Sequence, residues 1–231
     1  MSAWLASVVD AVEARMALAA GAGIVDAKNP HRGALGDLPH ATVRAIVEAV
    51  AGRAPVSATV GDFPGMPPDA VRAAVAAMAD TGVDFVKIGC FPAATLHACI
   101  DALAPLAARH ALVAVLFADQ VPDTALIPHL ARSGFRGVML DTAGKTGGGL
   151  THWQSPAQLA AFVALARRHG LLSGLAGSLR LADIPALAAL APDYLGFRGA
   201  LCDGHARTAA LDASALAAVG RAMRRGAALA A

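Results

Sequence analysis

The sequence predicts an α/β fold, a (β/α)8 TIM barrel, and three observations favour it. Short segments rich in Val, Ile, Leu and Phe recur about every 25 to 30 residues and alternate with alanine-rich segments of helical length. Eight strand segments can be drawn, and eight strands that are each followed by a helix close this barrel. The length of 231 residues lies near the lower end of the range for the fold.

The predicted strands follow the apolar segments. In chain order they are Leu5–Val9, Gly23–Lys28, Val56–Val60, Phe85–Gly89, Ala111–Phe117, Gly137–Leu140, Leu171–Leu175 and Tyr194–Phe197. Two helix starts support this division: Asp10 with Glu13 is typical of a capping box, and Pro156 occupies a first helical position. A doubly wound sheet is disfavoured, because the G-x-G of GAGIVD precedes a strand, whereas the dinucleotide motif follows one.

Composition predicts one domain and excludes several classes of partner. No composition shift or charge block divides the chain, so residues 1–231 are expected to form a single catalytic barrel domain. The net charge is +2 and the arginines are spread along the chain, which disfavours nucleic acid but leaves anionic small molecules as ligands. Charges or histidines interrupt every apolar run before the roughly 18 residues of a membrane span, so no membrane contact is expected.

The amino-terminal segment and the cysteines indicate a cytoplasmic protein. MSAWLASVVDAVEAR lacks the basic region of a secretory signal. Cys90, Cys99 and Cys202 have no C-x-x-C spacing, which disfavours disulfides and a structural zinc site. We expect buried thiols, although Cys90 is close enough to Lys87 to line the same pocket. A homo-oligomer is compatible with the sequence.

The lysines are the most informative residues. The chain has three, Lys28, Lys87 and Lys145, against sixteen arginines, and each lies where an apolar run breaks into a loop with Gly or Pro. An amine, unlike a guanidinium, can lose a proton near neutral pH and attack a carbonyl carbon. The lysines are therefore predicted to be catalytic; as remnants of a skewed composition, the alternative, they would scatter onto helix surfaces.

Polar residues gather at the carboxyl ends of the predicted strands, where TIM barrels build their active sites. Asp26 and Lys28 are two residues apart on a strand, so their side chains face the same side. They could act together on one substrate, or they could form a structural ion pair. Lys87 in FVKIG is expected to line the barrel interior near its mouth. The alternative is that its apolar stem is buried while its ammonium group reaches solvent. Asp141 ends the sixth strand, and Lys145 follows in a glycine-rich loop that allows close approach to a ligand.

Two turns of small residues follow the seventh and eighth strands. They contain Gly177 and Ser178, and Arg198 and Gly199, at the place where such barrels often hold phosphate on backbone N–H groups. These turns predict a phosphate-binding site. At other strand ends, Asp62 and Asp119 either orient the lysines or cap loops.

The eight histidines do not predict a metal site. Four fall in predicted helices or at their ends, where a solvated or packing role is expected. His31, His152 and His205 lie in loops without i,i+4 or H-x-H spacing. The sequence therefore predicts neither a metal nor another cofactor.

Taken together, these motifs resemble the (5-formylfuran-3-yl)methyl phosphate synthases of methanofuran biosynthesis. The resemblance runs through almost the whole chain, in GAGIVDAKNPHRGALG, ATVGDFP, FVKIG, MLDTAGK, LAGSL and GFRGALC. It implies a TIM-barrel carbon–oxygen lyase that condenses two glyceraldehyde 3-phosphate molecules into a phosphorylated furan aldehyde, losing phosphate and water. By position, it implies that Lys28 forms a Schiff base and Lys87 accepts a proton, while Asp26, Asp141 and Lys145 match the other polar active-site residues.

Two further functions remain open at this point. A Schiff-base aldolase acting on another sugar phosphate would also need a lysine at a strand end, but would not account for three lysines with two aspartates. A barrel that only binds a phosphorylated metabolite would need no reactive amine.

Overall fold

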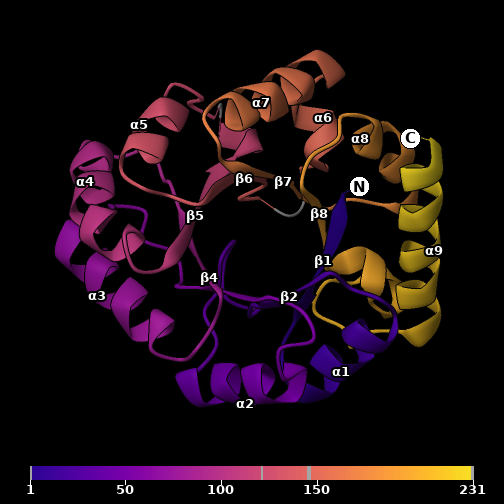
Figure 1. Cartoon of the computed structure of the whole chain (residues 1–231). Coiled ribbons are helices and arrows are strands. Elements are labelled where there is room, and N and C mark those ends of the chain that lie inside the picture. Colours follow the sequence, from indigo (N-terminus) through magenta and orange to yellow (C-terminus); the bar gives the residue numbers. More distant parts are fainter. Residues whose placement is uncertain (1, 121, 145–146, 230–231) are drawn as a thin grey trace.

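The computed structural model describes residues 2–120, 122–144 and 147–229, which form a closed barrel of eight parallel strands (Figure 1). Each strand pairs with the next, and β8 closes the barrel against β1. The strands are β1 (Ala3–Val8), β2 (Ile24–Ala27), β3 (Val56–Thr59), β4 (Phe85–Gly89), β5 (Ala111–Phe117), β6 (Gly137–Asp141), β7 (Leu172–Leu175) and β8 (Tyr194–Phe197). The predicted TIM barrel is confirmed.

Helices surround the strands (Figure 1). They are α1 (Ala11–Ala19), α2 (His40–Val50), α3 (Pro68–Ala79), α4 (Leu96–Ala107), α5 (Leu126–Arg132), α6 (Leu150–Trp153), α7 (Pro156–Arg168), α8 (Ile184–Ala189) and α9 (Ala213–Leu229). Short 3-10 helices follow three strands: η1 (Ala118–Gln120) after β5, η2 (Leu181–Asp183) after β7, and η3 (Gly199–Leu201) and η4 (Asp203–His205) after β8.

The predicted strand bounds agree with the structure to within two residues. The largest difference is at β1, which begins at Ala3 because that residue pairs with Tyr194 of β8. Strand β6 extends one residue further than predicted, because Asp141 pairs with Phe117 of β5. Both differences arise from pairing between strands, which local apolar patterns do not report.

Both predicted helix starts are present, with one difference in detail. The Asp10 carboxylate caps α1 by accepting hydrogen bonds from the N–H groups of Val12 and Glu13. The Glu13 carboxylate accepts from Val9 N instead of Asp10 N, so the capping box is incomplete there. Ser155 forms a complete capping box at the start of α7.

The register of the strands places polar side chains inside the barrel. Ser7 of β1, Asp26 of β2 and Ser57 of β3 are neighbours in register, and all three are buried. Because partners in a parallel sheet point to the same face, the three side chains form one polar row inside the barrel. This row lies below the carboxyl ends of the strands.

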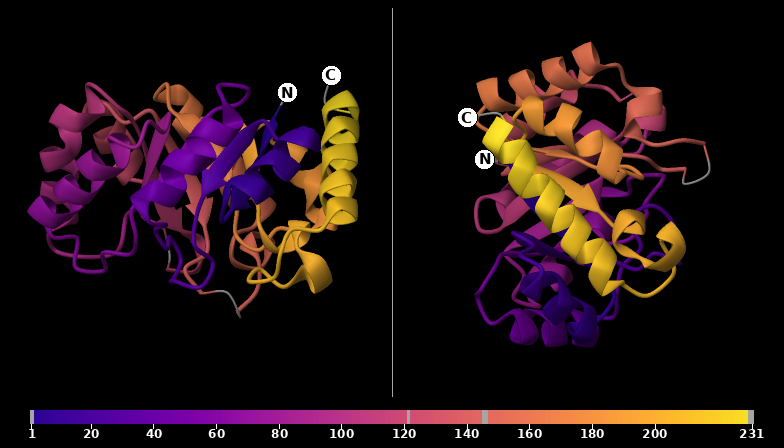
Figure 2. Two further views of the ribbon diagram at one scale, coloured as in Figure 1. Left: turned by 90° about the horizontal axis from the view of Figure 1, so that it is seen from below. Right: turned by 90° about the vertical axis from the view of Figure 1, so that its right-hand side faces the viewer.

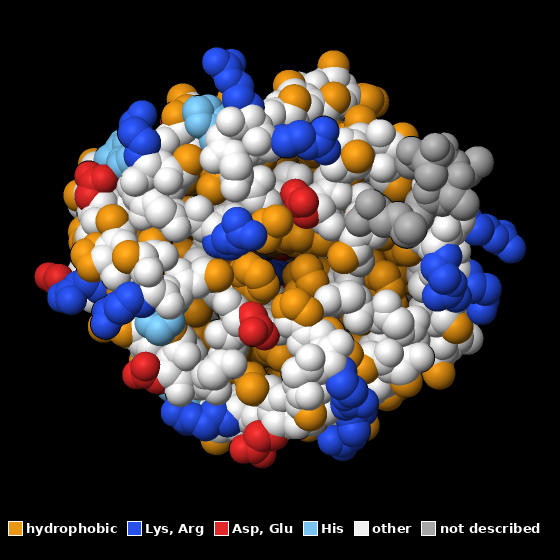
Figure 3. All heavy atoms as spheres, viewed as in Figure 1, with side chains coloured by type: hydrophobic (Ala, Val, Ile, Leu, Met, Phe, Trp, Pro, Cys, Tyr) orange, Lys and Arg blue, Asp and Glu red, His pale blue; other side chains and the backbone are white. Residues whose placement is uncertain are grey.

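The two ends of the barrel differ. The start of β1 and the end of α9 lie at the same end, where the strands begin, and α9 runs along the outside (Figure 2). Figure 3 looks onto this end, where hydrophobic side chains gather around a central hollow. None of the helices in the described part of the chain has the length and apolar character needed to cross a lipid bilayer.

Candidate active site

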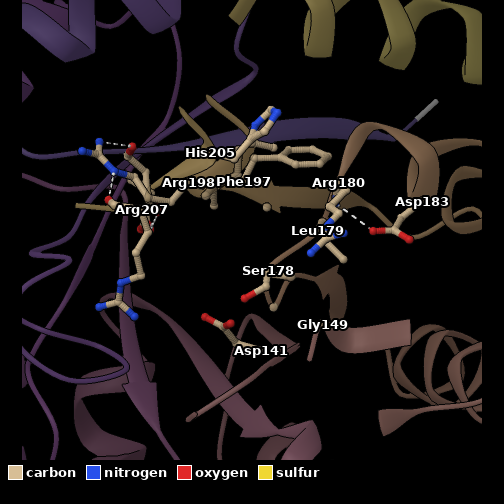
Figure 4. Close-up of a pocket in the computed structure, with 18 of the residues that line it drawn as sticks. Asp141, Gly149, Ser178, Leu179, Arg180, Asp183, Phe197, Arg198, His205 and Arg207 are labelled. Carbon is tan, nitrogen blue, oxygen red and sulfur yellow. Dashed lines mark hydrogen bonds between the residues drawn. The ribbon is translucent and has the colours of Figure 1, made fainter. Parts of the chain in front are cut away.

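A cavity of about 1100 Å³ opens at the carboxyl ends of the strands (Figure 4). Polar and charged side chains from several strands and their loops line it: Ser7, Asp26, Lys28, Lys87, Asp141, Thr151, Ser178, Arg180, Asp183, Arg198, His205 and Arg207. The described residues predicted to be catalytic and those predicted to bind phosphate therefore share one cavity. Lys145 lies outside the described residues.

The deepest charged group of the cavity is the Asp26 carboxylate, which is fully buried. It accepts hydrogen bonds from Ser7 Oγ at 2.8 Å and Ser57 Oγ at 2.6 Å, the two neighbours in the polar row. Lys87 Nζ lies 2.7 Å from Asp26 Oδ1. Three donors from three strands thus fix this carboxylate in one position.

Lys87 is 3% exposed and yet lines the cavity. Burial lowers the pKa of its amine, because the charged form loses its hydration. The nearby Asp26 carboxylate raises the pKa and the Lys28 ammonium lowers it, with the net change downward. At a given pH, a larger fraction of Lys87 is therefore in the neutral amine form than for a lysine in water.

Lys28 directly follows β2, and its amine pairs with a different carboxylate. Lys28 Nζ donates a hydrogen bond to Asp141 Oδ2 at 3.2 Å, and the lysine side chain remains 13% exposed. The backbone N–H of Lys28 donates to Val8 O, which continues the pairing of β1 with β2 past the strand end. The predicted alternative of an ion pair between Asp26 and Lys28 does not form, because Asp26 pairs with Lys87 and Lys28 pairs with Asp141.

Asp62 and Asp119 cap loops and contact no described lysine. The Asp62 carboxylate accepts from the N–H groups of Ala34 and Leu35, in the loop that follows Lys28. The Asp119 carboxylate accepts from Ala143 N at 2.8 Å and Gly144 N at 2.7 Å. Asp119 therefore fixes the chain immediately before Lys145.

The turn after β7 lines the cavity with Gly177 and Ser178. Gly177 has a φ of 109° and Ser178 a φ of 50°. A Cβ at Gly177 would lie 2.9 Å from Thr142 Cγ2, so the turn needs glycine both for its conformation and for space. The N–H groups of Gly177 and Ser178 donate to no other residue in the described ranges. They are available to an anion.

Arg198 follows β8, but protein acceptors occupy its guanidinium. Nε donates to Arg207 O, Nη1 to Ser7 O and Glu13 Oε2, and Nη2 to Glu13 Oε1 and Ala209 O. A guanidinium has five N–H donors, and all five are accounted for. The side chain therefore ties the loop after β8 to β1 and α1, and any contact of Arg198 with a ligand is left to its backbone.

Several polar residues of this region were not among the predicted site residues, and four of them bear on the argument. Ser7 and Ser57 hold Asp26, while Arg180 and Arg207 line the cavity from the loops after β7 and β8. Arg180 N donates to Asp183 Oδ2, which shapes the loop after β7 (Figure 4). The position of both arginines after the last two strands was the available signal, because the active site gathers there.

The three cysteines have free, buried thiols, as predicted. The interpretation of Cys90 as a pocket residue is wrong, because it does not line the cavity. Burial raises the pKa of its thiol to about 12, so it is not a thiolate near neutral pH. Within the described ranges, no group of three or more His, Cys, Asp or Glu side chains is placed to hold a metal ion.

Comparison with known proteins gives a consistent set of relatives. The family model described as 4-HFC-P synthase matches residues 4–220. A (5-formylfuran-3-yl)methyl phosphate synthase from Methanocaldococcus jannaschii is 37% identical over 212 residues, 87% of this chain and 90% of the relative. Its counterpart from Methanosarcina acetivorans is 36% identical over 217 residues, covering 89% and 92%. A provisionally named synthase of the same kind from Methylorubrum extorquens is 51% identical over 222 residues, covering 96% and 92%.

Solved structures of low sequence identity share the barrel. Phosphoribosyl anthranilate isomerase from Thermotoga maritima superposes with a TM-score of 0.71 at 12% identity, covering 97% of this chain and 100% of that one. Thiamine phosphate pyrophosphorylase from Pyrococcus furiosus gives a TM-score of 0.66 at 10% identity, covering 97% and 96%. At these identities the likeness shows the fold alone.

Proposed function

The chain belongs to the 4-HFC-P synthase family, and we propose that it is a (5-formylfuran-3-yl)methyl phosphate synthase of methanofuran biosynthesis. In the proposed reaction, two molecules of glyceraldehyde 3-phosphate join to form the phosphorylated furan aldehyde. One phosphate and two molecules of water leave, which balances the atoms without an oxidant or a reductant.

The observation that carries this proposal is the presence of two lysine–carboxylate pairs on one cavity. Lys28 pairs with Asp141 at the mouth, and Lys87 pairs with Asp26 inside the barrel. A Schiff-base condensation needs an amine that forms an iminium and a base that moves a proton between carbon and enzyme, and the two pairs offer a candidate for each role. A single reactive lysine would suffice for a barrel that performs only one carbonyl step.

Lys28 is the better placed of the two for covalent chemistry. Its amine is partly exposed to the cavity, where the carbonyl carbon of a triose phosphate can approach it. Asp141 Oδ2, at 3.2 Å, is within reach of the proton that the amine releases as it adds to the carbonyl, and the carboxylic acid could return that proton to the carbinolamine hydroxyl, which leaves as water. The resulting iminium would acidify the adjacent carbon of the bound triose.

Lys87 fits the role of the base for that carbon. Because burial lowers its pKa, a larger share of the amine is neutral and able to accept a proton. The enamine formed in this way would attack the aldehyde carbon of the second triose, and elimination with ring closure would give the furan. The N–H groups of Gly177 and Ser178, together with the turn at Gly199, would hold a substrate phosphate meanwhile.

Trapping with borohydride tests the covalent step. Incubation of the protein with glyceraldehyde 3-phosphate and borohydride is expected to add the mass of a reduced triose phosphate to the peptide that contains Lys28. Lys28→Arg should abolish the adduct while keeping a positive charge. An adduct confined to Lys87 or Lys145 would contradict the assignment, and no adduct at all would favour a barrel that only binds its ligand.

Product analysis tests the reaction itself. Purified protein incubated with glyceraldehyde 3-phosphate alone should accumulate a furan aldehyde chromophore and release inorganic phosphate in equal amounts. Activity is expected to survive exhaustive chelation, because an iminium already supplies the electron sink. Formation of a simple aldol product without a furan would indicate the Schiff-base aldolase instead.

A further inference from the structure

Arg207 is placed at the cavity by contacts with two loops. It follows η4, in a segment that the bridge between Cys202 and Leu211 closes at its base. The Arg207 guanidinium reaches across to the loop after β2, where Nη2 donates to Pro30 O and to Gly33 O. The side chain is half-buried.

The backbone of Arg207 is held by the buried pair of Arg198 and Glu13. Arg198 Nε donates to Arg207 O at 2.9 Å, and Arg198 Nη1 lies 2.5 Å from Glu13 Oε2. Helix α1 and strand β1 thus fix the segment that carries Arg207. An arginine held in this way keeps its guanidinium in place without a ligand, which lowers the entropic cost of binding one.

The Arg207 guanidinium has donors to spare. Nε and Nη1 make no hydrogen bond to any residue in the described ranges, and no described carboxylate forms an ion pair with Arg207. Lys28 and Lys87, by contrast, each have a carboxylate partner. Burial lowers the pKa of Arg207, which marks an incompletely hydrated guanidinium, although arginine remains charged.

We propose that Arg207 binds the phosphate of the second triose phosphate, the one that is not joined to Lys28. The inference rests on the proposed function, because only a reaction of two phosphorylated substrates needs two anion subsites in one cavity. Arg207 and Ser178 lie on different sides of the cavity (Figure 4). One phosphate bound to backbone N–H groups and one bound to Arg207 would place the two reacting carbons between them.

A guanidinium suits this subsite for chemical reasons. Its planar donors match phosphate oxygens, and charge-assisted hydrogen bonds are the stronger kind. Two phosphates close together repel one another, so a fixed positive charge on one side favours simultaneous occupancy. Arg198 cannot serve, because its donors are occupied; it acts as a positioning residue for Arg207.

Inorganic phosphate is the first probe, because its binding does not depend on turnover. We expect wild-type protein to bind two phosphates and Arg207→Ala to bind one, measured by calorimetric titration or 31P NMR. The matched control is Arg167→Ala, an exposed arginine on α7 that also donates to a backbone carbonyl, Ala191 O. The control should bind two. Equal stoichiometry in wild type and Arg207→Ala would overturn the inference.

The second measurement separates the two substrates. In Arg207→Ala, the concentration of glyceraldehyde 3-phosphate that half-saturates the borohydride adduct at Lys28 should change by less than about twofold, within the range of an unperturbed site. The KM for furan formation should rise about 10- to 100-fold, the range for losing charged hydrogen bonds. Arg207→Lys should lie between the two, because it keeps the charge but not the planar donors.

The outcomes also distinguish this inference from the proposed function. If wild-type protein makes no furan, the proposed function fails. The phosphate stoichiometry still shows whether Arg207 binds a phosphate. If furan forms and Arg207→Ala keeps both its KM and two bound phosphates, the function stands and the inference fails. If Arg207→Ala loses the Lys28 adduct as well, with an unchanged unfolding midpoint, Arg207 only supports the loop after β2 and the second subsite is overturned.

Discussion

Lys87 Nζ lies 2.7 Å from Asp26 Oδ1 inside the barrel, and both side chains are almost completely excluded from solvent. The pair comes from β4 and β2, which are not adjacent in the sheet. The hydroxyls of Ser7 and Ser57 occupy the other positions around the carboxylate. These contacts hold the Asp26 carboxylate in one orientation. Its negative charge therefore stays beside the Lys87 amine whether that amine is protonated or neutral.

Replacing Lys87 by arginine separates proton transfer from charge. If the amine acts as a base, Lys87→Arg keeps the positive charge but should lower kcat by about 10² to 10⁴, the usual loss for a general base. KM should change little. Steady-state rates at saturating triose phosphate measure the effect, with thermal unfolding as the check on folding. A variant that retains most of its turnover would show that Lys87 acts through its charge alone.

The pH dependence of the rate should report the pKa of Lys87. If the neutral amine is the base, kcat should rise with pH and level off above the pKa, which burial places below the usual 10.5. The Asp26 carboxylate raises this pKa, so Asp26→Asn should move the inflection to lower pH. Asp69→Asn, an exposed carboxylate on α3, is the control and should leave it unchanged. A shift to higher pH in Asp26→Asn would contradict the assignment.

The fold could be predicted because its signals are local. Alternation of short apolar and alanine-rich segments fixes the order of strands and helices, and strand period places Asp26 and Lys87 inside the barrel. The ion pairs could not be predicted in the same way. Asp26 pairs with Lys87 and Lys28 with Asp141 because of where the closed barrel brings distant strands, whereas sequence spacing only placed Asp26 and Lys28 on the same face.

The arginines illustrate the same limit. Arg198 stands at the end of β8, where a phosphate ligand is expected, yet Glu13 and three backbone carbonyls occupy its guanidinium. Glu13 comes from α1, at the far end of the sequence from Arg198. Arg207 has no motif of its own and reaches the cavity only because the loop after β8 is folded back on itself. Contacts of this kind depend on tertiary structure.

Loss of the Glu13 charge should destabilise the protein. The Glu13 carboxylate faces Arg198 and also accepts from the N–H groups of Val9 and Leu211. Glu13→Gln leaves the buried guanidinium without its counter-charge, which typically costs about 3–5 kcal/mol in the free energy of unfolding. Denaturant titration measures this, with Glu48→Gln on the exposed side of α2 as the control, for which no comparable change is expected.

Glu13→Gln also separates two roles of the buried pair. Because Arg198 holds the carbonyl of Arg207, the variant should raise KM for triose phosphate under conditions where it remains folded, while Lys28 still forms its adduct. A loss of stability without any change in KM would show that the pair supports the fold and not the position of Arg207.

The barrel interior below the site should not accept a side chain at Gly174. A Cβ there would lie 2.4 Å from Tyr194 Cζ and 2.6 Å from its hydroxyl oxygen, so β7 packs directly against the tyrosine ring of β8. Overpacking of this kind costs about 1–3 kcal/mol, and we expect Gly174→Ala to lower the free energy of unfolding by that amount. Gly65→Ala is the control, because a Cβ there meets nothing within 4 Å.

A second variant tests whether the tyrosine ring is the cause. If Tyr194 is the obstacle, Gly174→Ala combined with Tyr194→Leu should be less destabilised than the sum of the two single variants, with a coupling of about 0.5–3 kcal/mol as found for residues in contact. Denaturant titrations of the four proteins give the coupling directly. Strict additivity would place the strain elsewhere, in the backbone of β7, and would show that the ring can move aside without cost.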